Sequence, residues 1–153
     1  MSHAQVPLWA GPALWLASSS GSKGWQMSQW RPDGYNAASP YLIVSNARGT
    51  LAFLREAFEA EPLRIMERPD GSLRHAEVRI DDSVVMFADA VEGWPAVAAH
   101  VHLYVPDVDA SYRRALAAGA EPVMEPAQKA DEDKRGGVKD VGGTTWWLAT
   151  QVG

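Results

Sequence analysis

Hydrophobic and polar positions follow two different periods along most of the chain. In 47–58 and 108–116 the apolar residues recur every three or four positions, which predicts two amphipathic helices. Asn46 and Asp107 precede these stretches and are suited to cap the free N–H groups of the first turn. Gly119 follows the second stretch and suits a left-handed exit from a helix. We therefore expect one short helix in each half of the chain.

Short apolar or alternating runs surround each expected helix, as β-strands do. After the first helix the expected strands are 63–67, 73–80 and 83–88. The same order returns in the second half, where Glu61-Pro62 and Glu121-Pro122 mark equivalent points about sixty residues apart. The sequence therefore predicts two βαβββ pseudo-repeat modules, at about 38–90 and about 100–153, joined by a linker at 91–99.

This order of elements predicts an α+β fold with a free sheet surface. One helix for every four strands cannot cover both faces of a sheet, so each helix packs on one face only. If the two modules pair edge to edge, they form an open eight-stranded β-cup whose concave side is available to a ligand. We expect the function of the protein to depend on what this cup holds.

The first 26 residues follow neither period. They include the run Ser18-Ser19-Ser20-Gly21-Ser22, and Met27 after them reads like a natural start. We interpret 1–26 as an upstream extension or a cloning remnant without an assigned function. We expect 27–153 to form a single domain.

Composition restricts the classes of partner. The chain has 153 residues, a net charge of −5 and no basic stripe, which disfavours nucleic-acid and anionic-membrane partners. The absence of cysteine excludes disulfides, thiolate metal sites and a cysteine nucleophile, and it suits a cytoplasmic location. We therefore expect a small-molecule ligand, no nucleic acid and no membrane.

An ordered set of stretches resembles one known family. The stretches are 39–44, 51–58, 74–80, 83–86, 102–109 and 139–150. Together they resemble the glyoxalase/bleomycin-resistance/dioxygenase superfamily, also called the vicinal oxygen chelate fold, and most of all its small bacterial members labelled only "glyoxalase family protein". The resemblance covers the chain from about Trp30 onward. It implies the same two-module fold, and a homodimer, because modules from two chains often combine in this superfamily.

The resemblance also implies where a divalent metal would bind, with one ligand on the inward face of each of four strands. Carried over to this sequence, the four positions fall at Ser39, about Met86, His100 and Trp147. Only His100 is a plausible ligand, whereas a divalent metal normally needs three or four protein ligands. The standard site therefore looks dismantled, and the cofactor is left open, with a divalent metal as one option. Glyoxalase-type isomerisation and extradiol oxygenation are implied by the family and not by these residues.

Strand periodicity assigns other side chains to the inward face of the cup. If the alternate apolar residues pack against the helices, the strand at 73–80 turns His75, Glu77 and Arg79 inward. On the other strands the expected inward residues are Ser39, Tyr41, Ile43, His100, His102, Tyr104, Thr145, Trp147 and Ala149. We predict His75, Glu77 and His102 as catalytic residues, because histidine exchanges protons near neutral pH and a neighbouring carboxylate can orient it.

The remaining inward residues favour ligand binding. Tyr41, Tyr104 and Trp147 would supply flat apolar walls, as small-molecule pockets commonly have. The stretch 131–137 is expected to be a loop that can fold over the mouth of the cup, with Gly136-Gly137 as its hinge. Its cationic residues Lys134 and Arg135 would meet an anionic ligand. The predicted ligand-binding residues are therefore Tyr41, Arg79, Tyr104, Trp147 and Arg135.

Each of these interpretations has a structural alternative. The polar row on the strand at 73–80 can be a solvent-exposed ladder, and 131–137 can be a solvated charged loop. His100 and His102 can be satisfied polar residues at a module or subunit junction. A non-standard metal site built from His75, Glu77, His100 and His102 is a further option.

Two functional hypotheses follow. The first is an enzyme of the lyase or isomerase kind, which uses the inward His/Glu cluster for proton transfer with or without a metal. The second is a non-catalytic protein that binds an antibiotic-like or aromatic compound and sequesters it, as the bleomycin-resistance branch of the family does. The incomplete ligand set and the bulky Trp147 favour the second, whereas the His75/Glu77 pair favours the first.

Overall fold

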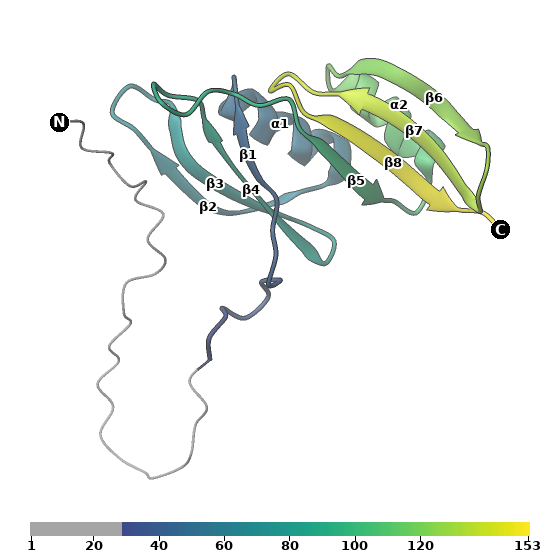
Figure 1. The fold of residues 1–153 in the computed structure, drawn as a ribbon, viewed down its shortest axis with the longest axis horizontal. Coiled ribbons are helices and arrows are strands. Elements are labelled where there is room, and N and C mark those ends of the chain that lie inside the picture. The colour runs from purple at the N-terminus through teal and green to yellow at the C-terminus, as the bar shows by residue number, and fades with distance from the viewer. Residues whose placement is uncertain (1–28) are drawn as a thin grey trace, which may run out of the picture. The chain divides into compact units, whose positions relative to one another are not determined.

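The structure confirms the two-module architecture. The computed structural model describes residues 29–153, so the predicted extension at 1–26 lies outside the described residues. Module one contains β1 (Tyr41–Val44), α1 (Ala47–Phe58), β2 (Glu61–Glu67), β3 (Leu73–Ile80) and β4 (Ser83–Asp89). Module two contains β5 (His100–Tyr104), α2 (Val108–Ala117), β6 (Glu121–Gln128), β7 (Asp133–Lys139) and β8 (Thr145–Gln151). The sheets have the orders β1-β4-β3-β2 and β5-β8-β7-β6, each with its helix on one face (Figure 1).

Both helices begin at the predicted caps. The side chain of Asn46 accepts a hydrogen bond of 2.9 Å from the backbone N–H three residues on, and Asp107 does the same at 3.1 Å. Gly119, which follows α2, has the predicted left-handed conformation with a φ of 102°. Within residues 29–153 neither helix combines the length and the apolar character that crossing a bilayer requires.

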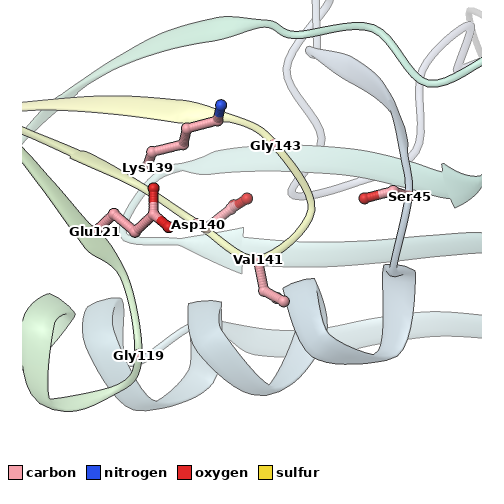
Figure 2. Close-up of a pocket in the computed structure, with 7 residues that line it drawn as sticks. All are labelled: Ser45, Gly119, Glu121, Lys139, Asp140, Val141 and Gly143. Carbon is pink, nitrogen blue, oxygen red and sulfur yellow. The ribbon is translucent and has the colours of Figure 1, made fainter.

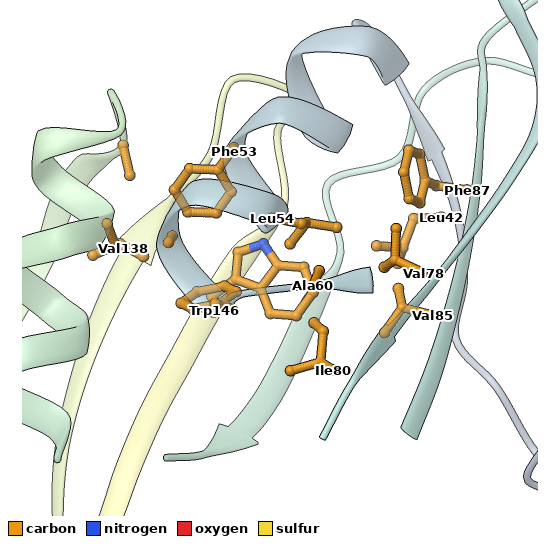
Figure 3. Close-up of a cluster of buried hydrophobic side chains, with 14 of the residues drawn as sticks. Leu42, Phe53, Leu54, Ala60, Val78, Ile80, Val85, Phe87, Val138 and Trp146 are labelled. Carbon is orange, nitrogen blue, oxygen red and sulfur yellow. The ribbon is translucent and has the colours of Figure 1, made fainter. Parts of the chain in front are cut away.

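One hydrophobic core serves both modules. Trp146 of β8 is fully buried, and its ring centroid lies 5.3 Å from that of Phe58 at the end of α1. Leu54 of α1 and Val78 of β3 belong to the same cluster, as does Val138 of β7 (Figure 3). Truncation of a fully buried aromatic side chain costs about 3–5 kcal/mol, so Trp146 makes a large contribution to the stability of the module junction.

The expectation that strands of the two modules pair edge to edge is wrong. Among residues 29–153, β1 forms a ladder only with β4, and β5 only with β8, so the two sheets remain separate. The linker explains this, because the N–H of Val97 donates to the carbonyl of Ile43 at 3.0 Å and occupies the edge of β1. The modules are joined by packing of α1 against α2 and by the shared core. The eight strands still form an open arrangement and not a closed barrel.

The predicted flexible loop at 131–137 is also wrong, because most of it is strand. Residues 133–139 form β7 in the middle of the second sheet, between β6 and β8. The two glycines are needed for close packing and not for a hinge. A Cβ on Gly136 would lie 3.0 Å from the ring of Pro126, and a Cβ on Gly137 would lie 2.6 Å from the indole of Trp147.

Candidate functional site

The inward face of module one has the predicted alternation. Tyr41 of β1 and Glu77 of β3 are both in register with Met86 of β4, so the three side chains form one row across the sheet. The residues that alternate with them, such as Leu42 and Val78, are buried on the helix side. The strand parity read from the sequence therefore places Tyr41, Glu77 and their neighbours on the cup face.

A chain of polar contacts crosses this face. The hydroxyl of Tyr41 lies 3.3 Å from His75 Nδ1, and His75 Nε2 lies 2.8 Å from Oε1 of Glu77. The hydroxyl of Tyr35 donates to the other oxygen of the same carboxylate at 2.5 Å. Glu77 is only 5% exposed, so its carboxylate depends on these partners for the hydrogen bonds that water would otherwise supply. The histidine and the carboxylate are therefore fixed in a geometry that suits proton transfer.

Tyr35 was missed by sequence reasoning. It precedes β1, in a segment without regular periodicity, and no motif marks it. In the structure, the carbonyl of Gly34 accepts from Arg79 at 3.2 Å, and the side chain of Asn36 accepts from the N–H of Val84 at 2.9 Å. These bonds hold the segment against β3 and β4. Burial, followed by the contact with Glu77, raises the pKa of Tyr35 above its usual value of 10.0, so its hydroxyl remains a donor.

Trp147 dominates the inward face of module two. It is in register with His102 of β5 and Gly137 of β7, which places all three on one row. Its ring is nearly parallel to that of His100, with an interplanar angle of 7° and a centroid distance of 6.2 Å, and the two rings lie edge to edge. Its indole Nε1 donates to His100 Nδ1 at 3.1 Å. Because Gly137 has no side chain, the indole can lie directly over β7.

Arg135 joins this face through β7. Its Nε donates to His102 Nε2 at 3.2 Å, and its guanidinium donates to Asp133 at 2.9 Å. Asp133 also accepts from the hydroxyl of Tyr104 at 2.8 Å, and this hydrogen bond raises the pKa of Tyr104 above 10.0. The ring of Tyr104 meets that of His102 in a T-shaped contact at 4.8 Å. Sequence reasoning missed Asp133, because it treated the segment as a loop.

The match of the chain to a family model decides its classification. The model of the Glyoxalase/Bleomycin resistance protein/Dioxygenase superfamily matches residues 36–148, which is most of the 153-residue chain. The chain belongs to this superfamily.

The chain is also similar to individual proteins. The uncharacterized protein Mb0911c of Mycobacterium bovis is 36% identical over 130 residues, which cover 76% of this chain and 84% of the relative. Among solved structures, TioX from Micromonospora sp. ML1 aligns with a TM-score of 0.64 at 22% identity, covering 75% of this chain and 99% of TioX. The fosfomycin resistance protein FosX from Listeria monocytogenes aligns with a TM-score of 0.58 at 19% identity, covering 75% and 89%. The structural matches show a shared fold.

The residues at the superfamily's metal positions do not fit a divalent metal. A hydroxyl at Ser39, a thioether at Met86 and an indole at Trp147 supply no adequate donor set around His100. Within residues 29–153 no three histidine, aspartate or glutamate side chains converge as ligands of a metal would. The non-standard metal site considered from the sequence is therefore not formed within one chain.

The predicted site residues fall into two groups, one on each module. Module one holds Tyr41, His75, Glu77 and Arg79, and module two holds His100, His102, Tyr104, Arg135 and Trp147. In the described part of the chain, no hydrogen bond, ion pair or ring contact joins the two groups. A single hollow that contains both groups therefore stays a prediction.

A surface depression of about 400 Å³ lies elsewhere, where the turn between β7 and β8 meets the start of α1 (Figure 2). It is lined by Ser45, Gly119, Glu121, Lys139, Asp140, Val141 and Gly143. None of the predicted site residues lines it. The carboxylate of Asp140 is already occupied, because it accepts from two backbone N–H groups of the turn and from the indole of Trp146. We interpret this depression as a by-product of the module junction.

Proposed function

We propose that the protein binds a small, flat, partly aromatic molecule on the inward faces of its sheets and sequesters it without chemical change. The observation that carries the proposal is the nearly coplanar pair of Trp147 and His100, whose indole lies over Gly137 on an otherwise polar sheet face. Stacking surfaces of this kind favour planar ligands. The lack of a metal-ligand set at the superfamily positions favours binding over metal-dependent chemistry.

Exposed aromatic rings on both modules support the same function. Tyr41 is 44% exposed and Tyr104 is 63% exposed, and each lies beside a histidine on its strand face. One structural neighbour is named a fosfomycin resistance protein, which agrees with a role in the handling of a small molecule. Side chains of both modules would contribute walls to the site.

Binding of 2-naphthol tests the proposal. In isothermal titration calorimetry we expect saturable binding with one molecule per chain. Trp147→Leu should weaken it about tenfold, because an aromatic pair contributes roughly 0.5–1.5 kcal/mol beyond its buried area. Trp94→Leu is the matched control, because Trp94 is 46% exposed and lies in the linker, outside both groups. Equal loss of binding in both variants, or no saturable binding by the wild-type protein, contradicts the proposal.

Metal analysis separates the proposal from a metalloenzyme. After dialysis, the purified protein should retain much less than one equivalent of any transition metal, and 2-naphthol should bind equally well with and without a chelator. A stoichiometric metal that survives dialysis would count strongly against a simple binding protein. It would also show that the donor set is completed in a way that a single chain does not provide.

A second candidate function is proton transfer, and the buried His75/Glu77 pair favours it. Its imidazole and carboxylate are 2.8 Å apart, and Tyr35 anchors the second carboxylate oxygen. Such a pair can remove a proton next to a carbonyl group. Deuterium exchange at the methyl group of acetophenone, followed by NMR in D₂O, is a direct assay. A catalyst would lose this exchange on Glu77→Gln and keep it on Glu92→Gln, an exposed linker position. A binding protein would not accelerate exchange at all.

We also propose that the protein is a cytoplasmic homodimer. The outer edge of β5 pairs with no strand in the described part of the chain, and unpaired edges are common association surfaces. A dimer that set module one of one chain against module two of its partner would bring the two groups of site residues together. Light scattering after gel filtration should give twice the chain mass of 16.6 kDa. A monomeric mass at micromolar concentration would contradict the dimer.

A further inference from the structure

The hydrogen bond from Trp147 fixes the tautomer of His100. An indole nitrogen can only donate, so His100 Nδ1, 3.1 Å from it, must be an unprotonated acceptor. The ring proton of His100 is therefore on Nε2. His100 is exposed, and in the described part of the chain its Nε2 has no protein partner. This nitrogen is thus a free hydrogen-bond donor on the cup face.

Arg135 fixes the tautomer of His102 in the opposite sense. The guanidinium Nε can only donate, so His102 Nε2, at 3.2 Å, is the acceptor and the ring proton is on Nδ1. His102 is also exposed, and among residues 29–153 its Nδ1 has no acceptor. Alternate residues of a strand lie about 7 Å apart on one face, so one free N–H donor lies on the row of Trp147 and the other on the adjacent row.

The carboxylate nearest to the two histidines is already used. Asp133 accepts from both Tyr104 and Arg135, and its side chain is only 11% exposed. The charge of Arg135 is balanced by Asp133 at 2.9 Å and Asp131 at 3.5 Å. Around the two imidazoles the face therefore offers uncharged donors, and the cation in contact with them is balanced. Such a face matches a neutral ligand with acceptor oxygens better than an anion, which would need an unbalanced cation.

We propose that module two binds an uncharged, planar ring compound through ring carbonyl or ring ether oxygens. The oxygens accept from Nε2–H of His100 and Nδ1–H of His102, and the ring lies against the indole of Trp147. This inference rests on the proposed binding function and specifies the ligand class of the same site. It replaces the anionic ligand that Arg135 led us to expect from the sequence.

Two measurements test the inference. First, two-bond ¹H–¹⁵N correlation spectra of protein labelled at histidine report which ring nitrogen carries the proton. We expect the Nε2–H form for His100 and the Nδ1–H form for His102. The opposite assignment for either ring overturns the inference without affecting the proposed function. Second, calorimetry compares coumarin, a flat bicycle with acceptor oxygens only, with indole, a bicycle of similar size whose N–H only donates. Coumarin should bind about tenfold more tightly than indole.

Variants at the two histidines test whether their ring N–H groups cause the preference for coumarin over indole. His100→Phe and His102→Phe keep a flat ring but remove the N–H donor. Each should weaken the binding of coumarin several-fold and leave the binding of indole unchanged. Arg113→Gln, on the exposed side of α2, is the control and should change neither. If indole binds as tightly as coumarin, the inference fails and the proposed function survives. If neither compound binds, the proposed function fails and the inference fails with it.

Discussion

Substitution of Gly137 by alanine tests the geometry of the site directly. The new Cβ would lie 2.6 Å from Cζ3 and 2.8 Å from Cε3 of Trp147, whereas carbon atoms in contact lie about 3.5–4.0 Å apart. The indole must therefore lift from β7 by roughly 1 Å. That movement breaks the coplanar alignment with His100 and the hydrogen bond of 3.1 Å between the two rings. Gly137 does not have a positive φ, so the backbone itself accepts alanine.

The expected effects on stability and on binding differ in size. The lost ring contact and hydrogen bond cost roughly 1–2 kcal/mol, while alanine restricts the unfolded chain and returns about 0.4–1 kcal/mol. The free energy of unfolding in urea should therefore fall by only about 1 kcal/mol. The displaced indole should weaken the binding of 2-naphthol about tenfold, as measured by calorimetry. Gly136→Ala, whose Cβ would meet Pro126 on the other face, should leave binding unchanged. Wild-type affinity in Gly137→Ala would refute the assignment of Trp147 as the stacking surface.

Three further predictions concern the scaffold, the tyrosines and metal removal. Asp140→Ala leaves the buried indole N–H of Trp146 and two turn N–H groups without an acceptor, so the free energy of unfolding in urea should fall by about 3 kcal/mol. The exposed control Asp82→Ala should change it by less than about 0.5 kcal/mol, and equal losses would contradict the anchoring role of Asp140. The pKa of Tyr104 is raised by Asp133, so its folded form stays protonated above pH 10 and its contribution to stability is lost as pH rises through the raised pKa. Burial also raises the pKa of Tyr35 and Tyr41, so ultraviolet titration of Tyr104→Phe should lose one of several late-ionising phenols, and an unchanged curve would contradict this. Prolonged treatment with a chelator should leave the unfolding midpoint unchanged, and a fall of several degrees would reveal a structural metal.

The sequence predicted the features that depend on local pattern. Asn46 and Asp107 cap the helices because their short polar side chains reach backbone N–H groups three residues on. The alternation along β3 placed His75 and Glu77 on one face because strand side chains have a period of two. These are properties of neighbouring residues, and a single sequence contains them.

Packing between residues that are distant in the sequence could not be predicted from the sequence alone. The segment at 133–139 contains adjacent glycines and charges, which are typical of a loop, but the indole of Trp147 and the ring of Pro126 supply the cover that makes it a central strand. Tyr35 reaches Glu77 across 42 positions of sequence, and nothing near Tyr35 indicates that partner. The alternation assigned most of the site residues to strand faces, but Arg135 was wrongly placed in a loop. The separation of the site residues into two groups depends on how the modules pack.

Chemical-shift mapping with 2-naphthol on the chelator-treated protein tests the central claim most directly. If the inward faces bind a flat molecule without a metal, saturable changes will be concentrated at the indole N–H of Trp147 and at the rings of His100 and His102. Changes confined to the depression around Glu121 and Lys139, or no saturable change at any site, would contradict the claim.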